Sequence, residues 1–180
     1  MSRETPMWLF GYGSLMWDGW EDAFGCLYRT PADLEGHARI FNKKSLERWG
    51  THALPGLTLN LARHVRPSPA CRGVAFEFED AARGDIEAYL TRRETCAATE
   101  VPVALPETTV GALTYIYDGP RLIEDGLSLE ARAAMIVEAE GVAGSSYDYI
   151  KGVRAHLAAL GVRDPEVEVL WEAVASLMAR

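Results

Sequence analysis

The residue types best suited to chemistry first occur in a glycine-rich turn near the start of the chain. Apolar residues 8–10 lead into Gly11-Tyr12-Gly13-Ser14. A short apolar run before a turn signal indicates a buried strand. Gly11 and Gly13 can adopt positive φ and lack a Cβ atom, so another molecule can approach the backbone closely. Successive N–H groups in such a turn can bind an anion or an oxyanion; the competing interpretation is an ordinary flexible turn.

A second candidate is a carboxylate that interrupts an apolar helix pattern. Ile86 and Leu90 lie four residues apart on one helix face, and the next position on that stripe is Glu94. Burial and a helix C-terminus both disfavour a negative charge. A carboxyl group in that setting suits a general base working near neutral pH. Alternatively, Glu94 pairs with a neighbouring arginine on a solvated surface, or the helix ends at Thr91.

Other chemistries have weaker support in the sequence. Ser14 lacks the flanking glycines of a nucleophile elbow, Met16 occupies the third glycine position of a dinucleotide fingerprint, and Cys96 has no activating neighbour. The three cysteines and four histidines lack disulfide-framework or metal-ligand spacing, so we expect no metal site. A basic cluster could be a solvated loop or could bind a substrate carboxylate; it comprises Lys43, Lys44 and Arg48.

Strands are expected to dominate the first two thirds of the chain and helices the last third. Strand patterns cover residues 7–12, 33–41, 56–66, 73–78, 99–105 and 109–117, with an aromatic connection at 19–27. Helices are expected to begin at Asp80, to run from Ser128 to Glu140, to open with the Ser145/Asp148 capping box, and to begin at Asp164 before Pro165. The last helix is expected to bury Val167, Leu170, Trp171, Val174, Leu177 and Met178.

This segregation of strands and helices predicts an α+β fold with a small, mostly antiparallel barrel or curled sheet. With 180 residues and no linker or repeat, the chain is expected to form a single domain, 1–180. The net charge of −8 argues against nucleic acid and anionic membranes as partners. A polar N-terminus, the absence of a long apolar run and the few cysteines favour a cytoplasmic location.

Several segments form an ordered set that covers most of the chain. They are Phe10-Gly11-Tyr12-Gly13-Ser14-Leu15, Gly36-His37-Ala38-Arg39-Ile40-Phe41 with Ser45, Gly50-Thr51 with Pro55-Gly56-Leu57, Cys71-Arg72-Gly73-Val74-Ala75-Phe76, Arg93-Glu94, and residues 141–150. In this order they resemble the ChaC-type γ-glutamylcyclotransferases of the γ-glutamylcyclotransferase-like superfamily. Two places depart from that pattern. Thr95-Cys96-Ala97-Ala98 replaces the usual K-G-G-Y, and Val142, Ala143 and Ser146 replace a proline, a serine and an asparagine.

The resemblance implies a mixed β-barrel with peripheral helices and a lyase that forms 5-oxoproline from glutathione or a related γ-glutamyl peptide. The α-amine of the substrate attacks its own γ-amide carbonyl, with Glu94 as the general base. The implied substrate-binding residues are Tyr12, Gly13, Ser14, Leu15, Arg39 and Tyr149. No metal or cofactor is required, the partner is the small-molecule substrate, and a monomer or weak homodimer is expected.

Two alternatives remain open within this resemblance. The substrate could be a γ-glutamyl amine or amino acid, because the residues after Glu94 depart from the usual pattern. The chain could also be a non-catalytic γ-glutamyl-binding domain, although Glu94 itself is present.

Overall fold

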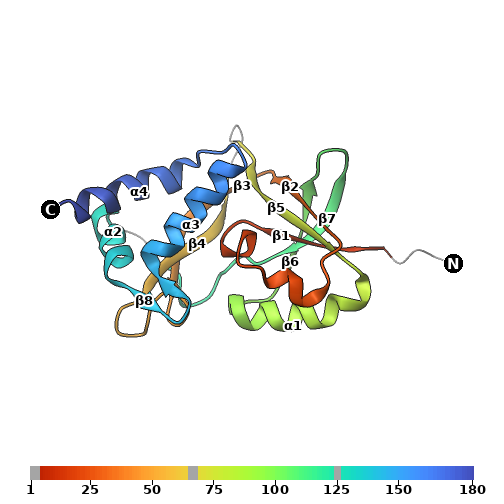
Figure 1. Ribbon diagram of the computed structural model, residues 1–180, viewed down its shortest axis with the longest axis horizontal. Helices are drawn as coiled ribbons and strands as arrows, with labels where there is room; N and C mark the ends of the chain where they lie inside the picture. Colours follow the sequence, from red (N-terminus) through yellow and green to blue (C-terminus); the bar gives the residue numbers. More distant parts are fainter. Residues whose placement is uncertain (1–4, 65–68, 124–126) are drawn as a thin grey trace. The chain divides into compact units, whose positions relative to one another are not determined.

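The apolar run near the start of the chain becomes strand β1 (Met7–Gly11) of a closed five-stranded barrel (Figure 1). The computed structural model describes residues 5–64, 69–123 and 127–180. The barrel order is β1-β5-β2-β6-β7, in which β5 is Cys71–Phe78, β2 is Tyr28–Leu34, β6 is Thr99–Ala104 and β7 is Thr109–Thr114. Strand β1 runs parallel to β7 at Leu9 and Leu113, and the other neighbours are antiparallel. A mixed, mostly antiparallel barrel is therefore confirmed.

The chain divides into two compact units by its internal contacts. The barrel unit contains Met1–Ala38 and Arg63–Tyr117, and the helical unit contains Arg39–Ala62 and Asp118–Arg180, in each case as far as the residues are described. The barrel unit includes helix α1 (Arg83–Glu94) and the short helices η1 (Ser14–Met16), η2 (Trp20–Phe24) and η3 (Asp80–Ala82). With helices α2 (Leu129–Glu138), α3 (Ser146–Ala159) and α4 (Pro165–Met178) of the helical unit, these elements confirm the α+β class.

Aromatic packing joins the barrel wall to the elements beside it. The Trp20 ring lies 5.5 Å from the rings of Phe76 and of Phe78, both of which are fully buried in β5. The expected aromatic connection thus packs as a wall against the barrel. Helix α1 lies beside η2 (Figure 1), and the rings of Phe24 and Tyr89 are 5.3 Å apart. Apolar burial therefore fixes α1 against the segment that follows the glycine-rich turn.

Two expectations for the barrel unit are wrong. The single strand expected at 33–41 is two strands, β2 and β3 (His37–Ser45), because Gly36 turns the chain with a φ of +71°. Asp80 does not cap α1; its carboxylate instead accepts a 2.7 Å bond from Arg83, and no side chain caps that helix. The hairpin expected from 99–105 and 109–117 is confirmed as β6 and β7.

The helical unit combines a two-stranded sheet with three helices. Strand β3 pairs with β4 (Gly56–Arg63); residues 65 and 66 of the expected strand 56–66 lie outside the described residues. The helices are α2 (Leu129–Glu138), α3 (Ser146–Ala159) and α4 (Pro165–Met178), which contact one another (Figure 1). No helix in the described part of the chain has the length and apolar character needed to cross a bilayer.

Local capping signals place the starts of these helices correctly. Ser128 accepts from the Ala131 N–H, Ser145 and Asp148 form the expected capping box, and Asp164 caps α4. The expected end of α2 at Glu140 is wrong, because the chain turns extended at Ala139 and forms the short pair β8 (Glu140–Gly141) and β9 (Gly144–Ser145). In α4, Val167, Leu170 and Val174 are buried as expected, Trp171 and Leu177 are partly exposed, and Met178 is exposed.

Close backbone packing explains three glycines of the helical unit. A Cβ atom on Gly50 would lie 2.0 Å from the Gly56 nitrogen, and one on Gly141 would lie 2.5 Å from the Gly50 nitrogen. Segments that are distant in the sequence therefore meet at one point where no side chain fits.

Two glycine-to-alanine substitutions in the barrel unit should have opposite effects on stability. A Cβ atom on Gly73 would lie 2.3 Å from the Gly11 carbonyl oxygen, so Gly73→Ala should lower the free energy of unfolding by roughly 2 kcal/mol or more. Gly84 in α1 has no atom within 4 Å of the corresponding position, so Gly84→Ala should raise it by roughly 0.5–1 kcal/mol. Urea unfolding of both variants tests this, and a neutral Gly73→Ala would contradict the packing described.

Candidate functional site

The glycine-rich turn is anchored at the end of β1 by its neighbours in the barrel. The Phe10 carbonyl accepts a 3.0 Å bond from the Thr114 hydroxyl. Two residues further along, the buried Tyr12 hydroxyl donates a 2.6 Å bond to the Tyr115 carbonyl. The Leu15 carbonyl accepts from the Trp20 ring nitrogen at 3.1 Å. The turn is therefore held in place on both sides by buried hydrogen bonds.

Two adjacent N–H groups of this turn have no protein acceptor. The Gly13 and Ser14 carbonyls accept from the N–H groups of Met16 and Trp17 at 3.0 and 3.1 Å. The N–H groups of Gly13 and Ser14 themselves donate to no acceptor within residues 5–64, 69–123 and 127–180. Paired donors of this kind can bind an anion or an oxyanion.

The backbone of the turn differs from the expected one. Gly13 has a φ of −126°, and Gly11 is not among the described residues with positive φ. Glycine at position 11 instead permits close packing, since a Cβ atom there would lie 3.1 Å from the Leu15 Cβ atom.

Glu94 is the last residue of α1, so the helix extends past Thr91 and continues the stripe of Ile86 and Leu90. The Ile86 and Leu90 side chains are fully buried, whereas the Glu94 side chain is 22% exposed. Its Oε1 atom lies 3.4 Å from the Nε atom of Arg93. Both earlier interpretations are therefore partly right: Glu94 continues the core-facing stripe and also contacts a neighbouring arginine.

The residue after Glu94 has an unfavourable backbone conformation. Thr95 has φ 60° and ψ 26°, and it is the only non-glycine residue of the described chain with positive φ. A β-branched residue is an outlier in this region. Its hydroxyl donates a 2.6 Å bond to the Glu94 carbonyl. Strain of about 1–3 kcal/mol at such positions is typical of functional sites, and here it lies beside the candidate base.

Tyr115 has a buried hydroxyl whose hydrogen bonding is incomplete. The residue is 3% exposed, and no group in the described part of the chain makes a well-aligned hydrogen bond to its hydroxyl. Burial raises the pKa of Tyr115 to about 12; a weak hydrogen bond with the Thr91 side chain opposes this shift, and repulsion from Glu87, Glu94 and Cys96 adds to it. The group therefore stays protonated near neutral pH and remains a hydrogen-bond donor.

Arg93 connects the turn to the end of α1. Its Nη2 atom donates to the Ser14 hydroxyl at 3.1 Å and to the Asp18 carboxylate. Burial opposes the charge of Arg93, but the hydrogen bond and attraction of Asp18 together with Glu94 raise its pKa. Sequence reasoning noted Arg93 only as part of an Arg-Glu pair and missed Asp18 and Tyr115, for which no local pattern exists.

Arg39 and Tyr149 belong to the helical unit and have partners there. The Arg39 side chain is 1% exposed and donates to the Asp164 carboxylate at 3.3 Å. The Tyr149 hydroxyl accepts a 3.1 Å bond from the Leu59 N–H, and the ring packs against Trp49 at 5.3 Å. Their role as substrate-binding residues stays a prediction.

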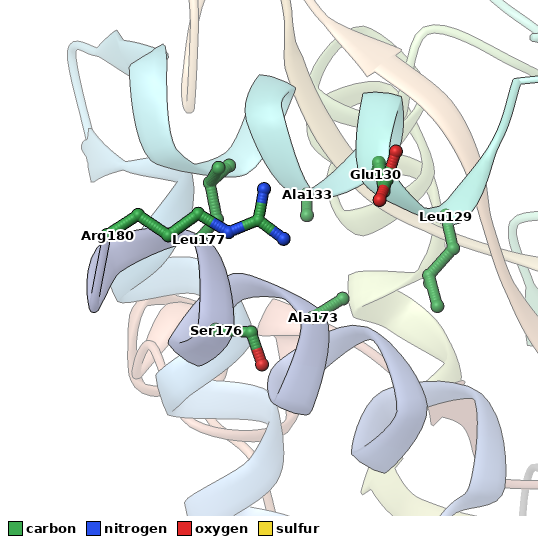
Figure 2. A pocket seen from close by; sticks show the side chains of 7 residues that line it. All are labelled: Leu129, Glu130, Ala133, Ala173, Ser176, Leu177 and Arg180. Carbon is green, nitrogen blue, oxygen red and sulfur yellow. The ribbon is translucent and has the colours of Figure 1, made fainter.

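Among the described residues, the basic cluster, the possible metal ligands and the cavity form no second candidate site. Lys43 and Lys44 lie in β3 rather than in the expected loop, with Arg48 in the turn that follows. No cluster of three metal-ligating side chains occurs among the residues described. A cavity of about 370 Å³ lies between α2 and α4. Figure 2 shows the Arg180 side chain, from just beyond the end of α4, extending between the two helices. None of the predicted site residues lines the cavity; its walls are Leu129, Glu130, Ala133, Ala173, Ser176, Leu177 and Arg180.

Comparisons with known proteins match nearly the whole chain. The sequence model of the family described as "ChaC-like protein" matches residues 7–177. The chain is 30% identical to gamma-glutamylcyclotransferase 2-3 of Arabidopsis thaliana, over 96% of this chain and 90% of that protein. It is also 30% identical to the glutathione-specific gamma-glutamylcyclotransferase of Escherichia coli (strain K12), over 98% of this chain and 76% of that protein.

A solved structure shares the fold. The crystal structure of a yeast γ-glutamyl cyclotransferase specific to glutathione superposes with a TM-score of 0.81 at 22% identity, covering 96% of each chain. Similarity at that identity establishes the common fold of the two chains.

Relief of the strained backbone should stabilise the protein. Thr95→Gly should raise the free energy of unfolding by roughly 0.5–1 kcal/mol, because positive φ costs a non-glycine residue about 1–2 kcal/mol and the freer unfolded glycine offsets part of the gain. Ala88→Gly, at an exposed helical position of α1, should instead lower it by about 1 kcal/mol. Equal losses in both variants, measured by urea unfolding, would exclude strain at Thr95.

Proposed function

This chain belongs to the ChaC-like family, and we propose on that basis that it is a γ-glutamylcyclotransferase, a lyase that acts on glutathione or a closely related γ-glutamyl peptide. The relatives named glutathione-specific support the choice of substrate. One observation carries the chemistry: Arg93 contacts both the Glu94 carboxylate and the turn whose Gly13 and Ser14 N–H groups have no acceptor in the described part of the chain.

The proposed reaction closes a five-membered ring within the substrate. The free α-amine attacks the γ-amide carbonyl carbon, a new C–N bond forms, and the old C–N bond to the released amine breaks. The products are 5-oxoproline and, from glutathione, Cys-Gly. The attacking nitrogen loses one proton and the leaving nitrogen gains one. Glu94 performs both transfers, which a carboxylate can do as base and then as acid.

The turn after β1 supplies donors for negative charge. The Gly13 and Ser14 N–H groups bind either the oxyanion of the tetrahedral intermediate or the α-carboxylate of the substrate, and both assignments fit two adjacent donors. The Tyr115 hydroxyl is a further donor close to Glu94. Because the substrate must fold back on itself, holding both of its ends supplies much of the acceleration.

A γ-glutamyl amine or amino acid is the second candidate substrate. The observation that favours it is the stretch Thr95–Ala98, where a strained Thr95 follows the proposed base directly. Arg39 and Tyr149 are retained as proposed substrate-binding residues. A non-catalytic binding domain is the third reading, and a general-base carboxylate at position 94 argues against it.

The cellular setting belongs to the same proposal. The matched range 7–177 takes in most of both compact units, which supports one functional domain over residues 1–180. Three free cysteines suit a reducing cytoplasm. We expect a monomer or weak homodimer without a nucleic-acid or membrane partner.

Loss of the Glu94 carboxylate should abolish turnover. With glutathione, Glu94→Gln should reduce the rate of 5-oxoproline release by roughly 10³-fold or more, because general acid–base catalysis typically contributes about 10²–10⁴-fold to a rate. The control Asp85→Asn removes an exposed carboxylate from the same helix and should keep wild-type activity. Release of 5-oxoproline is measured over glutathione and a panel of γ-glutamyl amines and amino acids. A wild-type protein inactive on the whole panel would contradict the proposed function, and an active Glu94→Gln variant would contradict the assigned base.

Tyr115→Phe should gain stability and lose activity. The change removes a buried hydroxyl whose hydrogen bonding in the described chain is limited to a weak bond with Thr91, so the free energy of unfolding should rise by up to about 1 kcal/mol. Between pH 10 and 12 the wild type loses stability, because its unfolded state releases the phenol proton that the folded state keeps, so the advantage of the variant grows there. Its kcat should fall roughly 10-fold or more. The exposed Tyr28→Phe should change neither quantity; a fully active Tyr115→Phe would remove this hydroxyl from the site.

A further inference from the structure

Arg93 is a buried cation that joins two parts of the barrel unit. Its side chain is 5% exposed although it lies at the C-terminal end of a helix beside a partly exposed glutamate. One guanidinium reaches the Ser14 hydroxyl at 3.1 Å, the Asp18 carboxylate and the Glu94 carboxylate at 3.4 Å. Ser14 and Arg93 are 79 residues apart in the sequence, so this contact exists only in the folded chain.

Arg93 binds Asp18 more directly than Glu94, and this difference suits a Glu94 carboxylate that must accept and release a proton. Asp18 is the direct hydrogen-bond partner and balances the buried charge, as a buried cation requires. The Glu94 contact is an ion pair at 3.4 Å and not a hydrogen bond, because the Arg93 Nε atom has no hydrogen-bond partner among the described residues. The guanidinium charge therefore attracts the Glu94 carboxylate, while Asp18 accepts the direct hydrogen bond. Glu94 is thereby held in place yet can exchange a proton with a substrate.

We propose that Arg93 is a positioning residue that fixes the Glu94 carboxylate relative to the Gly13 and Ser14 N–H groups through its bonds to Ser14 and Asp18. This inference rests on the proposed function for its catalytic part. Arginine suits the position because its Nη2 atom donates to both Ser14 and Asp18 while the other side of the planar guanidinium faces Glu94, whereas lysine offers a compact point charge. A shift of about 1 Å between reacting groups typically costs about 10²-fold in rate.

Arg92 provides the matched control. It is the preceding residue of α1, carries the same charge and is exposed. Arg92→Gln removes one positive charge from the same helix end without touching the contacts to Ser14, Asp18 and Glu94. Any effect specific to Arg93→Gln therefore reports the buried contacts rather than helix charge.

Hydrogen exchange tests the structural part without any substrate. In Arg93→Gln the amide groups of residues 11–18 should exchange roughly 10-fold faster than in wild type, because the turn loses the bonds to Ser14 and Asp18. Arg92→Gln should exchange like wild type. Unchanged exchange over 11–18 in Arg93→Gln would overturn the inference, whatever the enzyme does.

Kinetics test the catalytic part. On the best γ-glutamyl substrate, Arg93→Gln should lower kcat about 10²-fold while KM changes less than about 3-fold, since a misplaced base slows the chemical step more than binding. Arg93→Lys should recover part of the loss and remain about 10-fold below wild type. A fully active Arg93→Lys, or an effect on KM alone, would overturn the positioning role. An inactive wild type would contradict the proposed function and would leave the exchange experiment to decide the inference.

A paired substitution keeps the test valid if Arg93→Gln fails to fold. In Asp18→Asn/Arg93→Gln both charges are removed together, so no buried carboxylate is left without its cation. This double variant should match the kcat loss and the faster exchange expected for Arg93→Gln, relative to Arg92→Gln. A double variant with wild-type kcat and wild-type exchange would overturn the inference.

Discussion

Closure of the barrel through β1 is the constraint on which the barrel unit depends. This strand pairs with β5 on one side and with β7 on the other, so neither of its edges is left unpaired. The pairing continues to Gly11, where the Gly73 backbone approaches so closely that a side chain would not fit. Because the strand is held on both sides, the turn that follows it starts from a fixed point, and the bonds of Tyr12, Trp20 and Arg93 then hold the turn itself.

Several unfavourable features gather around the end of α1. Glu94 lies at a helix C-terminus, where the helix dipole opposes a negative charge. Thr95 follows it with positive φ, the Tyr115 hydroxyl is buried without a well-aligned hydrogen bond among the described residues, and Arg93 is a buried cation. Each of these lowers stability or demands compensation elsewhere. Their concentration in one part of a well-packed unit is what a site under functional constraint would show.

In the helical unit, residues of the family-like motifs also make hydrogen bonds that stabilise the fold. The Ser146 hydroxyl and the Tyr149 hydroxyl accept from the Leu57 and Leu59 N–H groups, which joins α3 to β4. Arg39 is bonded to Asp164, the residue that caps α4. These contacts account for the burial of the three side chains within the unit, independently of any ligand.

The sequence by itself determined the features that depend on neighbouring residues: the helix caps at Ser128, Ser145 and Asp164, the hairpin of β6 and β7, the strand before the glycine-rich turn, and the carboxylate on the α1 stripe. The sequence pattern missed the division of 33–41 at Gly36, because apolar residues continue across a bend whose direction depends on strand pairing. It also missed the end of α2 at Glu138, because the chain becomes extended at Ala139 to enter the β8–β9 pair. Tertiary structure alone decided that Arg93 contacts Ser14 and Asp18 and that Tyr115 lies near Glu94. Such contacts join residues about 20 to 80 positions apart, and only the closed barrel brings them within hydrogen-bonding or electrostatic range.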